Sequence, residues 1–597
     1  MLFSSATDLG RLLQTVRHLR PTQIFHRVLH HLPTAPPDTT PAPPLRKHRA
    51  SWIPPIPRQR SLLGRWKVRF LNEDGDIARA DQWNDPAKSK LWLYNLHYFD
   101  DLSAPADNSH HQLQRDFLDR WIAENAPGTG NGWEPYPTSL RIANWIKWAL
   151  AGTELESRWL DSLAQQIRWL SRRIEWHLLG NHLLANAKAL VLAGLFFEGP
   201  EAEAWLAKGL GLYARELPEQ ILRDGGHFEL SPMYHAIILE DLLDIINAAR
   251  TYGRADNQVF RDLPAITTRM RQWLAVMTHP DGELSLFNDA AFGVAPNRTA
   301  LEDYAWRLHL PAVTCPSDGV RHLRSSGYVR VDIDEMAAIL DLADVGPDYI
   351  PGHAHADTLS FELSLGAERI LVNMGTSTYE RGPLRELQRA TRSHNTLEIA
   401  DTNSSDVWAS FRVGRRARVS DVFIEKTNDC VLISGMHDGY RHLAGRPLHR
   451  RTWHFGANSL SLRDEILGST PHEGLARFIL SPSVQVIEAG SLKTVTLRTA
   501  RGRSVLFRSS TAVCIENTQW YPEFGQSVST QVITVPVSES ALHIQLVWLR
   551  HAHSFSYGQF SPGSQRPRIP DLRTLSGVGK TRSQGDRDYL CSEFPSG

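Results

Sequence analysis

The stretch PGHAHADTLSFELSLGAERILVNMG, residues 351–375, decides the fold class of the C-terminal half. Its segments LSFELSL and RILVNMG are strand-like and are joined by the turn Leu-Gly-Ala-Glu, with no helix between them. The same period of two continues through most apolar segments after about residue 322, as in CVLISGM and HIQLVWL. Many short strands without intervening helices predict an antiparallel β-sandwich over residues 322–560.

Upstream of this stretch the apolar period changes to that of a helix. From about residue 110 to 310, segments such as SLRIANWIKWALAG and IILEDLLDIINAARTYG carry apolar residues at three-to-four spacing. They recur with short breaks that contain Gly, Pro or Asp. A series of paired helices predicts either an α/α toroid or a solenoid of helical hairpins, which we place at residues 85–315.

The two ends of the chain have a different composition. Residues 1–84 begin with one or two amphipathic helices, in which apolar residues alternate with Arg and His, and continue with a proline-rich connector at 33–58. Residues 561–597 are rich in Ser, Gly, Pro and Arg, which predicts a disordered tail. Met1 to Leu32 has no long apolar core of a signal peptide, so the cytoplasm is the default location. No apolar run approaches the roughly 20 residues of a membrane span.

Charge and tryptophan content restrict the function classes. Lys plus Arg and Asp plus Glu both number 65 among the 597 residues, so nothing global favours a nucleic-acid partner. A polyanionic substrate would need a local basic cleft. The 18 tryptophans fit either a large helical core or a platform for sugar rings. The four cysteines are scattered and form neither a disulfide framework nor a zinc cluster.

The densest polar cluster lies in the deciding stretch itself. His353 and His355 alternate at what the pattern predicts to be the start of a strand, so their side chains should point the same way. Asp357 is nearby, and His394 stands before a further strand in TRSHNTLEIA. Two imidazoles on one face suit metal ligation, or a catalytic base beside a ligand. The alternative is that these histidines only cap strand ends.

Two further clusters stand at predicted helix starts. In LLGNHLLANAKALVLAGL, Asn181 and His182 follow a glycine, and Asn181 is a candidate N-cap. A helix N-terminus also suits an anion such as a uronate carboxylate. In RDGGHFELSPMYHAIILEDLL, Glu229 and Tyr234 flank the proline before a helix. Taken alone, a tyrosine at such a place is more often a packing residue than a catalyst.

The fourth cluster is NGWEPYPTSLRIANW. Trp133, Glu134 and Tyr136 are predicted to lie in a loop, and Arg141 on the helix that follows. An aromatic loop with an arginine could line a sugar cleft. Arg141 could equally brace two helices through an ion pair.

The four clusters occur in an order that resembles the heparinase II/III and oligoalginate lyase superfamily of polysaccharide lyases. The resemblance runs from about residue 85 to 550 and is carried by WEPYPTSLRIANW, GNHLLANAKALVLAGL, DGGHFELSPMYH, GHAHADTLSFEL and SHNTLEI. NLHYFDDL further resembles members found in bacterial exopolysaccharide gene clusters. The family fold is an α/α toroid followed by an antiparallel β-sandwich, with the active site in the cleft between them.

The resemblance also implies roles. Asn181 and His182 would bind and neutralise a uronate carboxylate, Tyr234 would transfer a proton and His353 would be its partner base or acid. Trp133, Glu134, Tyr136, Arg141 and Glu229 would contact the substrate. His355 and His394 would ligate a structural zinc ion, and Asn373 stands where the family usually has an aspartate ligand. No organic cofactor is implied.

The implied reaction is β-elimination on an acidic polysaccharide. The proton next to the uronate carboxylate is removed and the 4-O-glycosidic oxygen leaves, which requires donors that stabilise the enolate and a nearby base. Tyr234 would need a depressed pKa to act as that base, since free tyrosine titrates near about 10. Alternatively His353 takes the proton and Tyr234 protonates the leaving oxygen.

Two other functions compete with this one. A glycoside hydrolase would need two carboxyl groups, and Glu134, Glu229 and Asp289 are available. A non-catalytic glycan-binding protein of polysaccharide assembly would fit the missing aspartate and the missing export signal. The family usually works in the periplasm or outside the cell, so these locations are also possible. The polymer, endo or exo action and the oligomeric state are left open.

Overall fold

The computed structural model describes residues 6–549, except 31, 33–34, 255, 315–317, 428–429 and 538–539. The predicted disordered tail lies outside the described residues. None of the described helices is long and apolar enough to cross a membrane.

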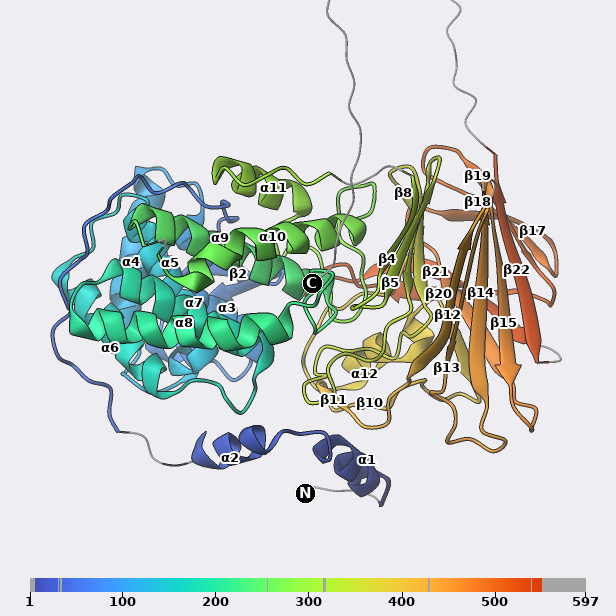
Figure 1. The fold of residues 1–597 in the computed structure, drawn as a ribbon, viewed down its shortest axis with the longest axis horizontal. Coiled ribbons are helices and arrows are strands. Elements are labelled where there is room, and N and C mark those ends of the chain that lie inside the picture. Colours follow the sequence, from blue (N-terminus) through green and yellow to red (C-terminus); the bar gives the residue numbers. More distant parts are fainter. Residues whose placement is uncertain are drawn as a thin grey trace, which may run out of the picture. The chain divides into compact units, whose positions relative to one another are not determined.

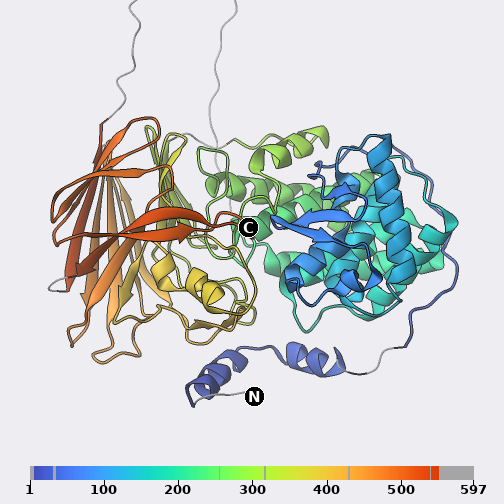
Figure 2. The same ribbon diagram turned by 180° about the vertical axis from the view of Figure 1, so that it is seen from behind.

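The first half of the chain is mainly helical (Figure 1). Its helices are α1 (Ala6–Val16), α2 (Pro21–His30), α3 (Lys90–Tyr98), α4 (Asn108–Glu124), α5 (Pro135–Leu150), α6 (Ser157–Arg172), α7 (Gly180–Phe196), α8 (Pro200–Gln220), α9 (Pro232–Thr251), α10 (Gln258–Val276) and α11 (Arg298–Arg307). Short 3-10 turns lie at η1 (Ala80–Asn84), η2 (Asp100–Ser103) and η3 (Asn131–Trp133). Sequence reasoning did not anticipate the small sheet of β1 (Leu62–Gly64), β2 (Lys67–Phe70) and β3 (Glu73–Asp76), which lies among these helices in Figure 2.

Helix α7 is the centre of the helical half. It is rich in Ala and Leu, is buried on nearly every side and packs against α5, α8 and α9. Gly194 lets α8 approach closely, because a Cβ at that position would lie 2.5 Å from the backbone nitrogen of Leu206. Many tryptophans of the helical half are buried. Six of them are essentially inaccessible to solvent: Trp83, Trp92, Trp121, Trp145, Trp159 and Trp273. Most of the tryptophan excess is therefore explained by helix packing.

The second half consists of antiparallel sheets. The five-stranded sheet contains β4 (Gly319–Leu323), β5 (Tyr328–Ile333), β6 (Met336–Asp341), β7 (Phe361–Leu365) and β8 (Glu368–Leu371), in that order. The four-stranded sheet has the order β20 (Cys514–Trp520), β21 (Val528–Val537), β16 (Gly474–Ile479) and β9 (Leu397–Ile399). The eight-stranded sheet has the order β12 (Val419–Lys426), β13 (Val431–His437), β14 (Leu448–Gly456), β15 (Ser459–Leu467), β22 (Ala541–Trp548), β19 (Ser504–Ser509), β18 (Thr494–Arg498) and β17 (Gln485–Ser491).

The faces of these sheets explain how they pack. Strands β13, β14 and β15 alternate between buried and more accessible residues, which is the pattern of a sheet with one covered face. Strands β5, β6 and β7 are buried on both faces. One face belongs to the sandwich core, and on the other Tyr328 and Ile339 pack against Trp273 and Met277 at the end of α10. The predicted fold class, an α/α toroid followed by an antiparallel β-sandwich, is confirmed.

Short elements at the junction carry much of the site. They are α12 (Pro383–Arg389), η4 (Thr391–Ser393) and the two-stranded ribbon of β10 (Val407–Trp408) and β11 (Arg412–Val413). The backbone hydrogen bond from Asp289 to His353 O, 3.0 Å long, ties the segment after α10 to the loop between β6 and β7. This bond fixes the two halves of the site against one another.

Candidate active site

Six of the residues singled out in the sequence come together where the helical half meets the sheets. They lie at the start of α5 (Tyr136), the start of α7 (Asn181, His182), the segment before α9 and the first turn of α9 (Glu229, Tyr234), and the loop between β6 and β7 (His353). Helix starts and loops supply all of them.

A buried carboxylate, Asp289, organises the sheet side of this site. It accepts hydrogen bonds from His353 Nδ1 and His355 Nε2, each 2.9 Å long, and from both terminal nitrogens of Arg385. Burial alone would raise the pKa of Asp289, but Arg385 and the two histidines hold this pKa well below its ordinary value. Asp289 is therefore a permanent anion whose charge Arg385 already balances.

The position of the two histidines differs from the prediction in one respect. His353 and His355 lie in a turn and a coil before β7, which begins only at Phe361, so they do not alternate along a strand. They nevertheless converge, because both bond to Asp289. The cause is loop geometry and not the pleat of a strand.

His353 stands between this carboxylate and the open side of the site. Because Nδ1 donates to Asp289, the neutral imidazole carries its lone pair on Nε2. Nε2 lies 3.8 Å from Glu229 Oε2. The ring of Tyr234 packs on the imidazole with 4.0 Å between ring centres, and the Tyr234 hydroxyl lies 3.1 Å from the hydroxyl of Tyr379. The lone pair of Nε2 and two phenol groups thus share one small region.

Burial raises the pKa of Tyr234 well above its ordinary value, and the neighbouring Tyr379 adds to the shift. The depressed value that a tyrosine base would need is therefore not what this environment produces. Ser231 caps α9 by accepting the backbone NH of Tyr234, at 3.2 Å, which fixes where the ring leaves the helix. Tyr234 is held as a protonated phenol.

Asn181 pairs with Glu229 and does not cap its helix. The N-cap of α7 is Leu179, and the Asn181 amide donates to both oxygens of Glu229, at 3.2 and 2.9 Å. Gly180, with φ of +56°, makes the approach possible, since a Cβ there would lie 2.3 Å from Glu229 Oε1. Burial raises the pKa of Glu229, but His227, His353 and Asn181 leave it lowered overall.

His182 is poised differently from His353. Its Nδ1 lies 3.0 Å from Glu175 Oε1, and its ring centre lies 4.6 Å from that of Tyr136. Burial lowers the pKa of His182, and the charge of Glu175 more than offsets this, so the pKa is raised overall. The arrangement favours an imidazolium beside a partly open surface.

Of the predicted substrate contacts, Arg141 is inaccessible, whereas Trp133 and Glu134 line a cavity although core residues or neighbouring side chains engage most of their surface. Arg141 is fully buried and bonds to Gln166 on α6 and to the carbonyl of His97, so it braces helices without an ion pair. Trp133 is 3% exposed, and its ring packs between those of other core tryptophans. Glu134 is held by Lys90 and Tyr94. The loop of Trp133 to Tyr136 is in fact a 3-10 turn followed by the first turn of α5.

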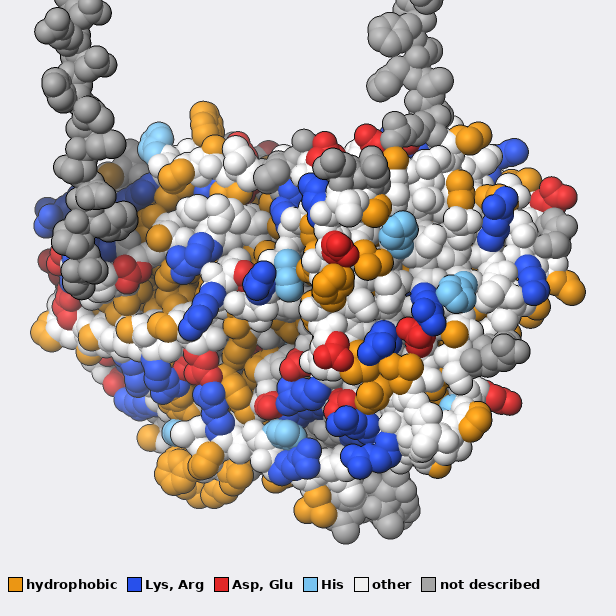
Figure 3. All heavy atoms as spheres, turned by 45° about the vertical axis from the view of Figure 1, so that its right-hand side comes forward, with side chains coloured by type: hydrophobic (Ala, Val, Ile, Leu, Met, Phe, Trp, Pro, Cys, Tyr) orange, Lys and Arg blue, Asp and Glu red, His pale blue; other side chains and the backbone are white. Residues whose placement is uncertain are grey.

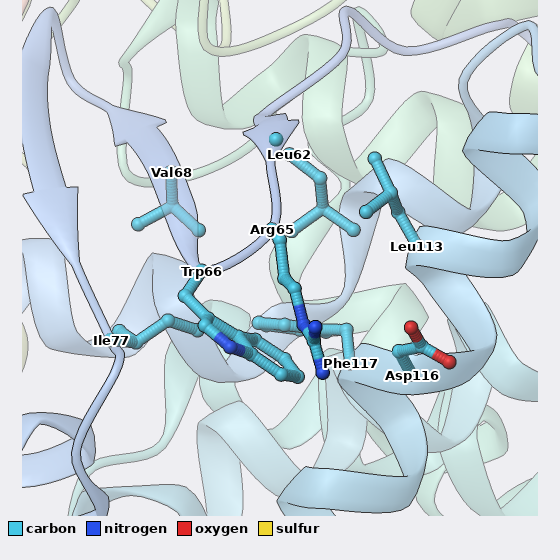
Figure 4. Close-up of a pocket in the computed structure, with 9 residues that line it drawn as sticks. Leu62, Arg65, Trp66, Val68, Ile77, Leu113, Asp116 and Phe117 are labelled. Carbon is cyan, nitrogen blue, oxygen red and sulfur yellow. The ribbon is translucent and has the colours of Figure 1, made fainter.

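A cavity of about 530 Å³ adjoins His182 through its partner Glu175. Its size lies within the roughly 300–1,000 Å³ of ligand pockets. The lining includes His30, Leu32, Tyr94, Glu134, Arg173 and His177. A second cavity, between β1–β3 and α4, encloses only about 10 Å³, is lined largely by apolar side chains and has room for about one water molecule (Figure 4).

Behind Asp289 lie the three predicted metal ligands. The rings of His355 and His394 are 5.3 Å apart, and His394 Nδ1 is 3.2 Å from Asn373 Oδ1. Within the described ranges of the chain, His355 Nδ1 and His394 Nε2 are buried and have no hydrogen-bond partner. Two orphaned imidazole nitrogens fit a pair of metal ligands. Among the described residues no three His, Cys, Asp or Glu side chains form a metal cluster. Asn373 would have to be the third ligand, and its oxygen would then have to exchange the bond to His394 Nδ1 for the metal.

Sequence reasoning missed several partners of the predicted residues. It considered Asp289 only as a hydrolytic acid, and it did not single out Glu175, Tyr379 or Arg385. Asp289 lies 64 residues before His353, so no local pattern links them. For Glu175 and Tyr379, a polar or aromatic side chain close in sequence to a recognised motif was the only signal.

The sequence was compared with known protein families, and two of them match it. Residues 123–305 match the family described as "Heparinase II/III N-terminus", and residues 315–549 match "Heparinase II/III-like, C-terminal". The chain belongs to the heparinase II/III-type lyase superfamily.

Characterised members of the superfamily resemble this one over part of their length. A heparin-sulfate lyase of Bacteroides stercoris is 26% identical over 316 residues, which is 49% of this chain and 44% of that protein. A heparin-sulfate lyase of Pedobacter heparinus is 25% identical over 265 residues, which is 41% of this chain and 39% of that protein. The matched regions thus span less than half of these relatives.

Solved structures share the fold. The crystal structure of heparinase III superposes with a TM-score of 0.62 at 19% identity and covers 78% of each chain. The structure of a heparan sulfate lyase from Pedobacter heparinus gives a TM-score of 0.53 at 15% identity and covers 81% of each chain. The likeness in fold therefore extends over most of the chain.

Proposed function

We propose that this protein is a polysaccharide lyase that cleaves a uronic-acid-containing polysaccharide by β-elimination. The observation that carries the proposal is the pairing of His353, whose Nδ1 is bonded to a permanent carboxylate, with Tyr234, which is held protonated. One group has a lone pair for a proton and the other has a proton to give.

The division of labour follows from these protonation states. His353 Nε2 takes the proton next to the uronate carboxylate, and the Tyr234 hydroxyl protonates the glycosidic oxygen as the bond breaks. His182, whose raised pKa favours the cation, and the Asn181 amide, which exchanges Glu229 for the substrate, bind the uronate carboxylate and stabilise the enolate that develops. The products are a free chain end and an unsaturated sugar.

The hydrolase alternative is less well supported. A glycosidase needs one carboxyl group that stays protonated near neutral pH. The pKa values of Glu229 and Asp289 are both lowered, and both groups are engaged with Asn181 or Arg385. Glu134 already accepts hydrogen bonds from Lys90 and Tyr94.

We also propose that His355, His394 and Asn373 bind a structural zinc ion. The two orphaned buried nitrogens support this, and a bound cation would satisfy them. Because Asn373 brings no negative charge, binding should be weaker than at a site with a carboxylate. Metal analysis of the purified protein, and its thermal midpoint with and without a chelator, test this proposal.

The proposed activity is tested by incubating the protein with a panel of polymers and following the ultraviolet absorbance of the unsaturated product. The panel contains heparan sulfate, unsulfated uronate polymers such as alginate, and the exopolysaccharide of the source organism. A rise that is lost in Tyr234→Phe supports the lyase. The matched control is Tyr252→Phe at the other end of α9, because the Tyr252 hydroxyl is buried without a partner.

Other outcomes contradict the proposal. New reducing ends without absorbance would indicate a hydrolase. Binding of a polymer without any cleavage would indicate a glycan-binding protein of polysaccharide assembly.

A further inference from the structure

The N-terminal helices α1 and α2 lie against the loops that carry the active-site residues. Figure 1 shows them in dark blue below the toroid and the sheets, near β10 and β11, and Figure 2 shows the same arrangement from behind. Three separate sets of contacts hold them.

Helix α1 is fastened to the ribbon of β10 and β11. Arg11 forms an ion pair with Asp406 at 3.0 Å. The hydroxyl of Thr15 donates to the carbonyl of Arg11 at 2.8 Å within α1 and shares this proton with the carbonyl of Val413 at 3.3 Å. It accepts a hydrogen bond from Trp408 Nε1 at 3.3 Å. Between the two strands stands Phe411, whose ring centre is 5.9 Å from that of His353.

The start of α2 is fastened to the loop that leads to His353. The Arg20 guanidinium lies 3.6 Å from the ring centre of Tyr349 and pairs with Glu219 on α8. Gln23 donates to the carbonyl of Tyr349 at 3.2 Å. Tyr349 is only four residues before His353.

The end of α2 is fastened to the segment that leads to His182. The ring of His30 stacks on that of His177 with 4.3 Å between centres, and His26 lies 6.0 Å from Trp176. His30 also lines the cavity of about 530 Å³ that adjoins Glu175. The helix pair therefore bridges loops from both halves of the site and supplies part of its wall.

Three arginines stand on segments that meet at this bridge, where the rings of Tyr379 and Phe411 have their centres 5.2 Å apart. Arg27 lies on α2, Arg381 two residues after Tyr379, and Arg412 directly after Phe411, with its guanidinium 4.8 Å from the ring centre of Trp408. Burial, and then the charges of Arg381 and Arg27, lower the pKa of Arg412. In the part of the chain that the structure describes, none of these three arginines has a salt bridge, whereas the neighbouring Arg385, Arg416 and Arg418 are paired with aspartates.

The positive charges of these three arginines repel one another unless an anion binds between them. Guanidinium groups bind carboxylates and sulfate esters through paired hydrogen bonds, which offset the repulsion between like charges. The space-filling view shows several basic side chains, with acidic ones among them, above the lower edge of the molecule (Figure 3). Tyr379 and Phe411 each contact His353, so the loops of Arg381 and Arg412 are also walls of the catalytic region.

We propose that helix α2 completes the substrate site, and that Arg27, Arg381 and Arg412 form a subsite for a second acidic group of the polymer. This group is a carboxylate or a sulfate ester on a sugar beyond the one that is cleaved. The inference rests on the proposed lyase function, since it assigns an additional contact with the same substrate.

The test compares Arg27→Ala, Arg381→Ala and the double variant with the native protein on one sulfated and one unsulfated uronate polymer. Each single variant should raise KM by about tenfold while kcat changes little, because one charge-assisted contact is lost. Arg27→Lys should recover part of the affinity. Arg508→Ala is the control, since Arg508 is exposed on β19, which carries no site residue. Arg27 and Arg381 are also exposed, and thermal midpoints verify that all variants are folded.

The outcomes separate the two proposals. A KM effect on both polymers identifies a carboxylate as the ligand, and an effect on the sulfated polymer alone identifies a sulfate ester. An unchanged KM in the double variant, with an active native protein, overturns the subsite. If the native protein cleaves nothing, the proposed function fails, and the Kd of heparan sulfate for the double variant decides the subsite separately. An increase of more than about tenfold supports the subsite, because two contacts are lost, and an unchanged value overturns it.

Discussion

His182 in the helical half and His353 in the sheet half are both bonded to a buried carboxylate, but the third partner differs. Glu175 has the neutral Asn186 as its other partner, so its charge acts on His182 and raises the pKa of that imidazole. Asp289 is already balanced by Arg385, so its bond to Nδ1 orients the imidazole of His353, and Glu229 is a second carboxylate 3.8 Å from Nε2. A histidine bonded to a carboxylate therefore suits two tasks in this site. His182 is suited to bind an anionic substrate, and His353 is suited to accept a proton.

The largest expected effect comes from removing the base. We expect His353→Ala to reduce kcat/KM by about 10³-fold, because proton transfer loses its acceptor. Initial rates of ultraviolet absorbance on an active polymer measure this. His454→Ala, at an exposed position of β14, should behave as the native protein does. A His353→Ala variant with more than half of native activity would show that another group is the base.

Removing the acid should cost slightly less. We expect Tyr234→Phe to lower kcat by about 10²-fold with little change in KM, because the leaving oxygen loses its proton donor while the ring still packs on His353. Substrates with a better leaving group should recover part of this loss. Full activity on ordinary polymer would remove Tyr234 from the mechanism.

The contrast between His182 and His353 is tested by removing Arg385, the cation that pairs with Asp289. In Arg385→Gln the aspartate keeps its charge without its cation, so the carboxylate that orients His353 and His355 is no longer held in place by the guanidinium. We expect kcat/KM to fall in this variant. Loss of a buried ion-pair partner should also lower the free energy of unfolding by about 3–5 kcal/mol. Native kcat/KM in a folded variant would contradict the role of Arg385.

A change in pH dependence is expected at His182. In Glu175→Gln the burial that lowers the pKa of His182 is no longer offset, so the alkaline limb of the kcat/KM profile should move to lower pH. The sign for stability agrees: the folded pKa is raised above 6.5, so the pair stabilises the fold fully below that pH and less as pH rises through the folded pKa. Urea titrations of both proteins across this range measure the second effect. If the alkaline limb of the kcat/KM profile does not move in Glu175→Gln, the protonation of His182 does not contribute to substrate binding.

The smallest effect on activity is expected from a substitution at Asn373, which lies beside the two predicted metal ligands. Asn373→Asp should increase zinc affinity, because a carboxylate replaces a neutral amide beside His355 and His394. Metal titration of the chelator-treated variant and of the native protein compares the two affinities. Equal affinities would argue against Asn373 as a ligand.

The sequence predicted those parts of this account that depend on local periodicity. The change from a helical to a strand period near residue 322 predicted toroid and sandwich correctly, and the ordered motifs around Asn181, Tyr234 and His353 indicated residues that do meet. Features that depend on distant partners were not predictable. Local patterns could not show that Asp289 holds His353, or that α1 would contact a ribbon almost 400 residues away, where Thr15 bonds to Val413. Burial of Arg141 was equally invisible, because the same helical position could have faced a cleft.

The central claim is that the chain breaks its substrate without adding water. The most direct measurement is mass spectrometry of the products formed in heavy-oxygen water from whichever polymer the panel identifies. The account predicts unsaturated products that contain no heavy oxygen and absorb in the ultraviolet. One heavy oxygen per broken bond, without the double bond, would contradict it and assign the site to hydrolysis.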